Sequence, residues 1–93
     1  MSKITVGTKR RVKRRLSGEN PTIWIGKSGI SEDLLKEIGK QLDKNEMVKI
    51  KVLRSALGEE ETRQIAIRIS EKADASLVEV RGHTFMLYRR HKK

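Results

Sequence analysis

The residues best suited to chemistry in this chain are Gly26, Lys27, Ser28 and Gly29, which separate a short apolar run from a segment that begins like a helix at Ser31. Two glycines leave the main chain open where a phosphate must approach, and amide groups at a helix start can point at that phosphate. Lys27 adds a mobile positive charge. A GxxG turn alone is a weak signal, because glycine pairs are common between strands and helices. The pattern therefore predicts a phosphate site that needs support from other residues.

Two acidic residues follow this turn directly. Glu32 and Asp33 lie in the first turn of the predicted helix, where negative charge is favoured by the helix dipole. The same carboxylates repel a phosphate, so the affinity of the site must come from Lys27 and from neighbouring cations. The neighbouring cations that we expect lie on or just beyond a later strand and are Lys49, Lys51 and Arg54.

Patterns typical of enzymes and metal sites are missing from the sequence. His83 falls in a predicted hairpin turn and His91 in a basic tail, and neither has a serine, cysteine or carboxylate partner at a recognisable spacing. The spacing of metal ligands is missing too. The chain contains no cysteine, which fits a reducing compartment. We therefore expect a protein that has no catalytic activity, cofactor or metal.

The positive charge of the chain is concentrated at its two ends. The 93 residues carry a net charge of +10 at pH 7. Residues 1–15 contribute +7 and residues 89–93 contribute +4, whereas the chain between them sums to −1. Dense basic segments usually bind nucleic acids, since each neutralised phosphate releases counterions. The N-terminal cations expected to contact a polyanion are Lys9, Arg10, Arg11, Lys13, Arg14 and Arg15.

The length and the hydropathy pattern bound the organisation of the chain. Ninety-three residues make one small domain with a thin core. No stretch approaches the roughly 18 apolar residues of a membrane span, and no apolar signal-peptide core follows the basic N-terminus. We expect a cytoplasmic protein with a flexible basic tail over residues 1–7, one domain over residues 8–90 and a basic tail over residues 91–93.

The N-terminal part of the domain predicts a helix followed by a strand. Thr8 is expected to cap a short helix that ends at Leu16, with Val12 and Leu16 one turn apart on its apolar side. Pro21 then favours an extended chain that enters a strand over residues 22–25.

A second helix and a second strand follow. Ser31 is a good N-cap, and apolar residues recur with helical spacing to about residue 44. Gly39 inside this helix indicates a close approach to a neighbouring element. Apolar residues alternate over residues 46–53, as in a half-buried strand. The inward positions of that strand are Val48, Ile50 and Val52.

The segment over residues 58–74 fits two structures. Its three isoleucines alternate as in a strand, whereas the glutamates at 59–61 and the spacing of Ile65, Ala66 and Ile69 fit a helix. We predict a helix, because strands seldom run so long.

The chain ends in a predicted β-hairpin, with strands over residues 76–81 and 84–89 and a two-residue turn of Gly82 and His83. The element order is then α-β-α-β-α-β-β. A strand-helix-strand unit has parallel strands, and a hairpin adds antiparallel pairing. The sequence therefore predicts an α/β fold of the α+β two-layer type, in which helices back a mixed four-stranded sheet.

Trp24 leaves two interpretations open. Alternation along the first strand directs its side chain outward beside lysines, where it could stack on a base. Alternatively, Val12 and Leu16 of the first helix cover it, which we favour because a lone exposed tryptophan is costly in a small domain. Phe85 and Tyr88 are expected to pack in the core.

Three stretches of the sequence together resemble the CRM domain, the chloroplast RNA splicing and ribosome maturation domain. They are Pro-Thr-Ile-Trp-Ile-Gly-Lys-Ser-Gly-Ile-Ser at 21–31, Met-Val-Lys-Ile-Lys-Val at 47–52 and Val-Arg-Gly-His-Thr-Phe-Met-Leu-Tyr-Arg at 80–89. Their order and spacing are those of the stand-alone, YhbY-like form, and the resemblance covers residues 8–90.

The resemblance implies an RNA-binding fold similar to the C-terminal domain of bacterial translation initiation factor three, with the GxxG loop as the RNA contact. Bacterial members associate with precursors of the large ribosomal subunit, whereas plant members with several such domains assist intron splicing. For a chain with one such domain, ribosome maturation is the nearer implication. The implied partner is ribosomal RNA or a precursor of the large subunit, with no membrane and no small-molecule substrate.

Two other classes of function stay open from the residues alone. An architectural DNA-binding protein can be equally small and basic, but that class mostly inserts apolar wedges between base steps. The GxxG turn favours RNA over that class. A protein-interaction module of the translation machinery, with basic segments that only supply solubility, is the second alternative.

Overall fold

The computed structural model describes residues 5–27, 29–54 and 61–90. Its elements are α1 (Val6–Leu16), β1 (Ile23–Ile25), α2 (Glu32–Asn45), β2 (Met47–Val52), α4 (Thr62–Lys72), β3 (Ser76–Arg81) and β4 (Thr84–Tyr88). The types and order of these elements confirm those predicted from the sequence. The helix predicted over residues 58–74 is present as α4, while the predicted start at residues 58–60 lies outside the described residues. Among the described helices, none has the length and apolar character needed to cross a bilayer.

The four strands form one mixed sheet in the order β1-β2-β4-β3. β1 pairs in parallel with β2, and β4 pairs antiparallel with both β2 and β3. The crossover through α2 allows the parallel pair, whereas the two-residue turn joins an antiparallel pair. Gly82 in that turn has a positive φ of 59°, a conformation that favours glycine. The predicted mixed sheet is therefore confirmed.

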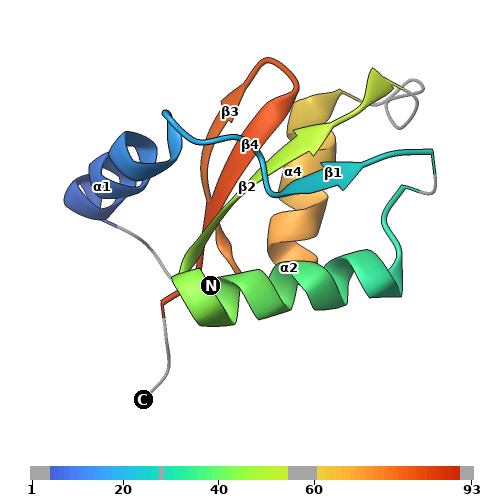
Figure 1. Ribbon diagram of the computed structural model, residues 1–93, viewed down its shortest axis with the longest axis horizontal. Helices are drawn as coiled ribbons and strands as arrows, with labels where there is room; N and C mark the ends of the chain where they lie inside the picture. Colours follow the sequence, from blue (N-terminus) through green and yellow to red (C-terminus); the bar gives the residue numbers. More distant parts are fainter. Residues whose placement is uncertain (1–4, 28, 55–60, 91–93) are drawn as a thin grey trace.

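The helices lie on both faces of the sheet, with α1 on one face and α2 and α4 on the other (Figure 1). The larger core is formed between the sheet and the second pair of helices, and Phe85 at its centre is fully buried. The inward residues of β2 belong to this core, as predicted. A smaller cluster joins α1 to the opposite face and consists of Val12, Leu16, Met47, Val78, Met86 and Tyr88.

Local capping explains where the first two helices begin. The prediction that Thr8 caps α1 is wrong, because its backbone N–H donates to the Thr5 hydroxyl at 3.1 Å and α1 begins at Val6. Both threonines can accept such a bond, and capping by Thr5 places Thr8 inside the first turn. The prediction for α2 is confirmed, since the Ser31 hydroxyl accepts from the Leu34 N–H at 3.1 Å.

The end of α2 fixes the start of β2. Glu46 adopts a left-handed conformation with φ of 67°, and its N–H donates to the Leu42 carbonyl at 2.8 Å. This residue therefore closes the helix. β2 begins at Met47, one residue later than predicted.

Candidate nucleic-acid interface

The predicted phosphate loop is a closed turn between β1 and α2. The Gly29 N–H donates to the Gly26 carbonyl at 2.9 Å, and Gly29 has a φ of 66°. This left-handed conformation favours glycine at position 29. No described atom lies within 4 Å of a Cβ built on Gly29, so this side of the turn is open. Lys27 is exposed, whereas Ser28 lies outside the described residues.

The loop lies at the end of the sheet where β2 ends and β4 begins. The Leu53 N–H donates to the Ile25 carbonyl at 2.8 Å, and the Val52 N–H donates to the His83 carbonyl at 2.7 Å. These two bonds bring the residue before the loop and the β3–β4 turn to the same end of β2. Two of the predicted cations, Lys51 and Arg54, are exposed at this end. The structure therefore brings them to the end of the sheet at which the loop with Lys27 begins.

Lys49 has a structural role that the sequence did not predict. Its Nζ donates hydrogen bonds to the Leu16 carbonyl at 3.0 Å and to the Glu19 carbonyl at 2.9 Å. The ammonium group thus binds the carboxyl end of α1, where the helix dipole favours a positive charge. A contact of Lys49 with RNA stays a prediction, and such a contact would compete with these two bonds.

Two of the six predicted cations of α1 contact residues of the sheet. Arg11 lies over the Tyr88 ring at 5.7 Å from its centroid, and Lys13 forms an ion pair with Glu79 at 3.4 Å. These two side chains contact the sheet side of the molecule. Because a helix turns by about 100° per residue, Arg10 and Arg14 project away from the side that carries Val12. The remaining predicted cations of this helix, Lys9 and Arg15, are exposed.

Arg89 is part of the fold although its charge belongs to the C-terminal basic segment. Its guanidinium donates to the Ala73 carbonyl at 2.8 Å, to the Gly39 carbonyl at 3.1 Å and to the Asp43 carboxylate at 2.8 Å. A Cβ built on Gly39 would lie 3.9 Å from this guanidinium, which is an ordinary contact, so the structure shows no approach at Gly39 that requires a glycine. This cation joins α2 to the end of α4.

Trp24 is exposed to 54%, so the preferred interpretation that α1 covers it is wrong. Val12 and Leu16 instead pack on β2, β3 and β4 at the far end of the sheet. β1 is a short edge strand, and α1 contacts it less than it contacts the other three strands. The prediction that Phe85 and Tyr88 are packing residues is confirmed, since both are buried.

Arg81 and Thr84 lie near Lys49 on the sheet face that carries α1, and neither was among the predicted site residues. They are register partners on β3 and β4, and Thr84 is also paired with Lys51. The signal was available, because a two-residue turn makes the residues on either side of it directly opposite each other. The predicted turn at Gly82 and His83 therefore implied this pair.

α1 and the connection between β1 and α2 lie at opposite ends of the molecule's long axis (Figure 1). The structure does not bring the two predicted groups of cations into one cluster. Within the described ranges, no group of three or more His, Cys, Asp or Glu residues is arranged to hold a metal ion.

Two proteins of other organisms are similar to this chain over most of its length. MJ0652 of Methanocaldococcus jannaschii, named a "Probable RNA-binding protein", is 36% identical over 87 residues, which are 94% of this chain and 64% of the relative. The chain thus spans less than two thirds of that relative's length. A Haemophilus influenzae protein named "RNA-binding protein" is 32% identical over 90 residues, which are 96% of this chain and 88% of the relative. Both names denote RNA-binding proteins and neither denotes an enzyme.

A solved structure and a family model extend the comparison to the fold. The solution structure of the hypothetical protein SAV1595 from Staphylococcus aureus matches with a TM-score of 0.76 and 30% identity, over 98% of this chain and 93% of that chain. The resemblance found in the sequence motifs is confirmed over nearly the whole chain. The model of the CRS1 / YhbY (CRM) domain matches residues 4–89, and the chain belongs to this family.

Proposed function

We propose that this protein binds ribosomal RNA in precursors of the large ribosomal subunit and acts there as an assembly factor. The observation that carries the proposal is the closed turn from Gly26 to Gly29, which presents Lys27 at the entrance of α2. Such a turn offers an open main chain, a helix start and a point charge to one phosphate. The names of the relatives support RNA as the polyanion.

The ribosomal part of the proposal rests on the resemblance to the stand-alone bacterial members of the family. The charge distribution adds a physical argument. The exposed cations of α1 and the loop lie far apart, so a large folded RNA can be bound at both ends of the protein at once. Each neutralised phosphate then contributes salt-sensitive affinity.

Crosslinking in cells, followed by sequencing of the bound RNA, tests the proposal. Wild-type protein is expected to enrich precursors of the large-subunit RNA. Replacing Lys27 and Ser28 with aspartates is expected to remove this enrichment while the fold is retained. The matched control carries Lys36→Asp and Lys40→Ser on the exposed side of α2, which changes the net charge by the same three units.

Two results would contradict the proposal. Enrichment of other RNA classes without ribosomal precursors would contradict the ribosomal assignment, and unchanged enrichment in the double-aspartate variant would exclude the loop as a contact. Salt-titrated binding to a folded ribosomal RNA fragment and to duplex DNA of equal length separates the remaining classes. Equal affinities would argue for a general DNA-binding protein, and no salt-dependent binding would argue for a protein-interaction module.

A further inference from the structure

Four residues, one from each strand, form a row across the sheet face that is turned away from α2 and α4. Trp24 is paired with Lys51, Lys51 with Thr84, and Thr84 with Arg81. Residues directly opposite each other in a sheet project from the same face. Because neighbouring strands lie about 4.8 Å apart, this Trp24 row is roughly 14 Å long.

The Trp24 row is open because α1 covers the other end of the same face. α1 packs on Met47 and Tyr88, and Met47 precedes Lys51 by four residues along β2, which is about 13 Å of strand. Trp24 is 54% exposed, and the two cations of the row are exposed as well. An indole and two positive charges therefore share one solvent-facing surface.

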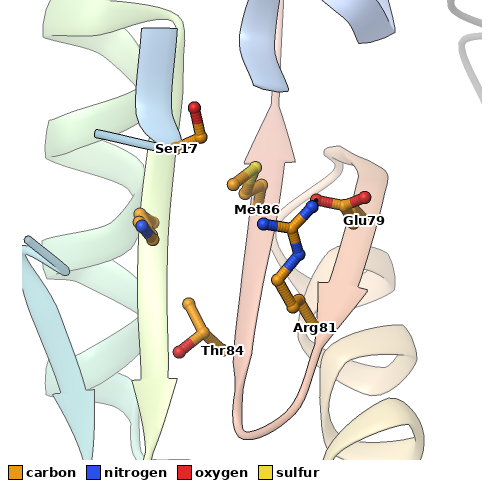
Figure 2. A pocket seen from close by; sticks show the side chains of 6 residues that line it. Ser17, Glu79, Arg81, Thr84 and Met86 are labelled. Carbon is orange, nitrogen blue, oxygen red and sulfur yellow. Dashed lines mark ion pairs between the residues drawn. The ribbon is translucent and has the colours of Figure 1, made fainter. Parts of the chain in front are cut away.

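A hollow of about 120 Å³ is lined by two residues of the row, Arg81 and Thr84, and reaches Ser17 at the end of α1 (Figure 2). Its lining residues are Ser17, Lys49, Glu79, Arg81, Thr84 and Met86. The volume is roughly ten times that needed to hold one water molecule, and the lining offers both hydrogen-bond donors and acceptors. Arg81 lies 3.7 Å from the Glu79 carboxylate, which also contacts Lys13, so the acid is neutralised on two sides.

We propose that the Trp24 row binds an unpaired segment of RNA, with one base stacked on Trp24 and the adjacent phosphates bound by Lys51 and Arg81. The inference deepens the proposed function and rests on it. A base in a duplex has both faces covered by its neighbours, whereas an unpaired base can stack on an aromatic side chain. The two cations match the charge of the backbone that carries the base.

The place of the row in the fold supports an RNA strand as the occupant. The row begins two residues before the loop and lies on the same face as α1. A strand that runs across it connects the two groups of predicted phosphate contacts. An unpaired segment flanked by folded RNA can therefore contact the Trp24 row while the folded RNA on either side contacts the loop and α1.

Tryptophan fluorescence provides a direct test, because Trp24 is the single tryptophan of the chain. The probes are an oligoadenylate, an oligouridylate of the same length and the duplex formed by annealing the two. Both single strands are expected to quench the emission of wild-type protein, and the duplex is expected to bind with little quenching. Excitation at the red edge of the indole band avoids absorption by the bases.

Substitutions then separate stacking from charge. Trp24→Ala is expected to weaken single-strand binding by about 5- to 150-fold, the range for loss of one stacked base, without changing the salt slope. Trp24→Phe should recover part of the affinity. Lys51→Gln and Arg81→Gln should each lower the salt slope by about 0.7. Ile67→Ala is the control, since Ile67 is an exposed apolar residue of α4, away from the row.

The outcomes distinguish failure of the proposed Trp24 row from failure of the proposed function. If RNA binds without quenching and Trp24→Ala retains wild-type affinity, the Trp24 row is excluded and the proposed function stands. Equal quenching by the duplex would overturn the assignment to unpaired RNA. If wild-type protein binds none of the probes and no folded ribosomal RNA fragment at low salt, the proposed function fails together with the row. Unfolding curves of all variants show whether a loss of binding reflects loss of the fold.

Discussion

The ammonium group of Lys49 donates a hydrogen bond to the carbonyl oxygen of Leu16 at 3.0 Å, and this bond ties β2 to the carboxyl end of α1. The same group also binds the Glu19 carbonyl. Val12 and Leu16 are the two buried residues of α1, so its attachment to the sheet depends on few contacts. A lysine predicted to contact RNA therefore helps to position the basic helix.

Lys49→Met should destabilise the protein by about 1–3 kcal/mol, since it removes the charged donor from the last carbonyl of α1, that of Leu16, and from the Glu19 carbonyl in the turn that follows. The free energy of unfolding, measured in urea, gives the size of the effect. Relative to the wild type, hydrogen exchange in this variant should accelerate more in α1 than in β2 and β4, because the substitution weakens the attachment of the helix to the sheet. Unchanged exchange in α1 would contradict this role.

Lys51→Met is the matched control for that substitution, since Lys51 is an exposed lysine on the same strand and face. It should change stability by no more than about 0.5 kcal/mol. It should instead reduce the salt dependence of RNA binding. The two lysines, which the sequence could not distinguish, are thus expected to affect different measurements.

The structural features that could be predicted from the sequence are those that depend on residues close together in the chain. The cap at Ser31, the inward residues of β2 and the Gly82-His83 turn each follow from neighbours within a few positions. The partners of Lys49 lie 33 and 30 residues away. Such contacts follow from the tertiary arrangement and not from periodicity.

The same reason explains the error at Trp24. Alternation correctly placed its side chain on the outer face of β1. Which strands α1 covers depends on the strand order, and that order places β1 at an edge. A pattern within one strand cannot show which helix crosses over it.

Arg89→Ala should lower the free energy of unfolding by about 2–3 kcal/mol. Most of this effect comes from the bonds to the Ala73 and Gly39 carbonyls, because Asp43 is largely exposed and a surface ion pair contributes little. Arg90→Ala, at the next and exposed position, serves as the control in the same urea measurement. Equal stability of the two variants would contradict a structural role for Arg89.

Substitutions of Gly39 and Gly29 by alanine should change the free energy of unfolding in opposite directions. A Cβ at Gly39 would lie 3.9 Å from the Arg89 guanidinium, an ordinary contact, so Gly39→Ala should stabilise the protein by about 0.5–1 kcal/mol. Gly29 has open space but a positive φ, so Gly29→Ala should destabilise it by about 1 kcal/mol. Urea unfolding of both variants checks the signs, and stabilisation by Gly29→Ala would contradict the left-handed conformation.

Substitution of the outward arginines of α1 measures the contribution of this helix to RNA affinity. Arg10 and Arg14 stand two residues on either side of the inward Val12, and Lys36 and Lys40 of α2 stand in the same relation to the inward Ile38. The two pairs therefore occupy equivalent positions on two helices, and replacing either pair with glutamine removes two positive charges.

Arg10→Gln with Arg14→Gln should reduce the slope of log affinity against log salt by about 1.4 to 1.8, the value for two lost phosphate contacts. Lys36→Gln with Lys40→Gln should leave the slope close to that of the wild type, because α2 lies on the sheet face opposite α1 and the Trp24 row. Filter binding to a folded ribosomal RNA fragment across a salt series measures both. Equal losses in the two double variants would mean that net charge, and not the position of α1, determines the affinity.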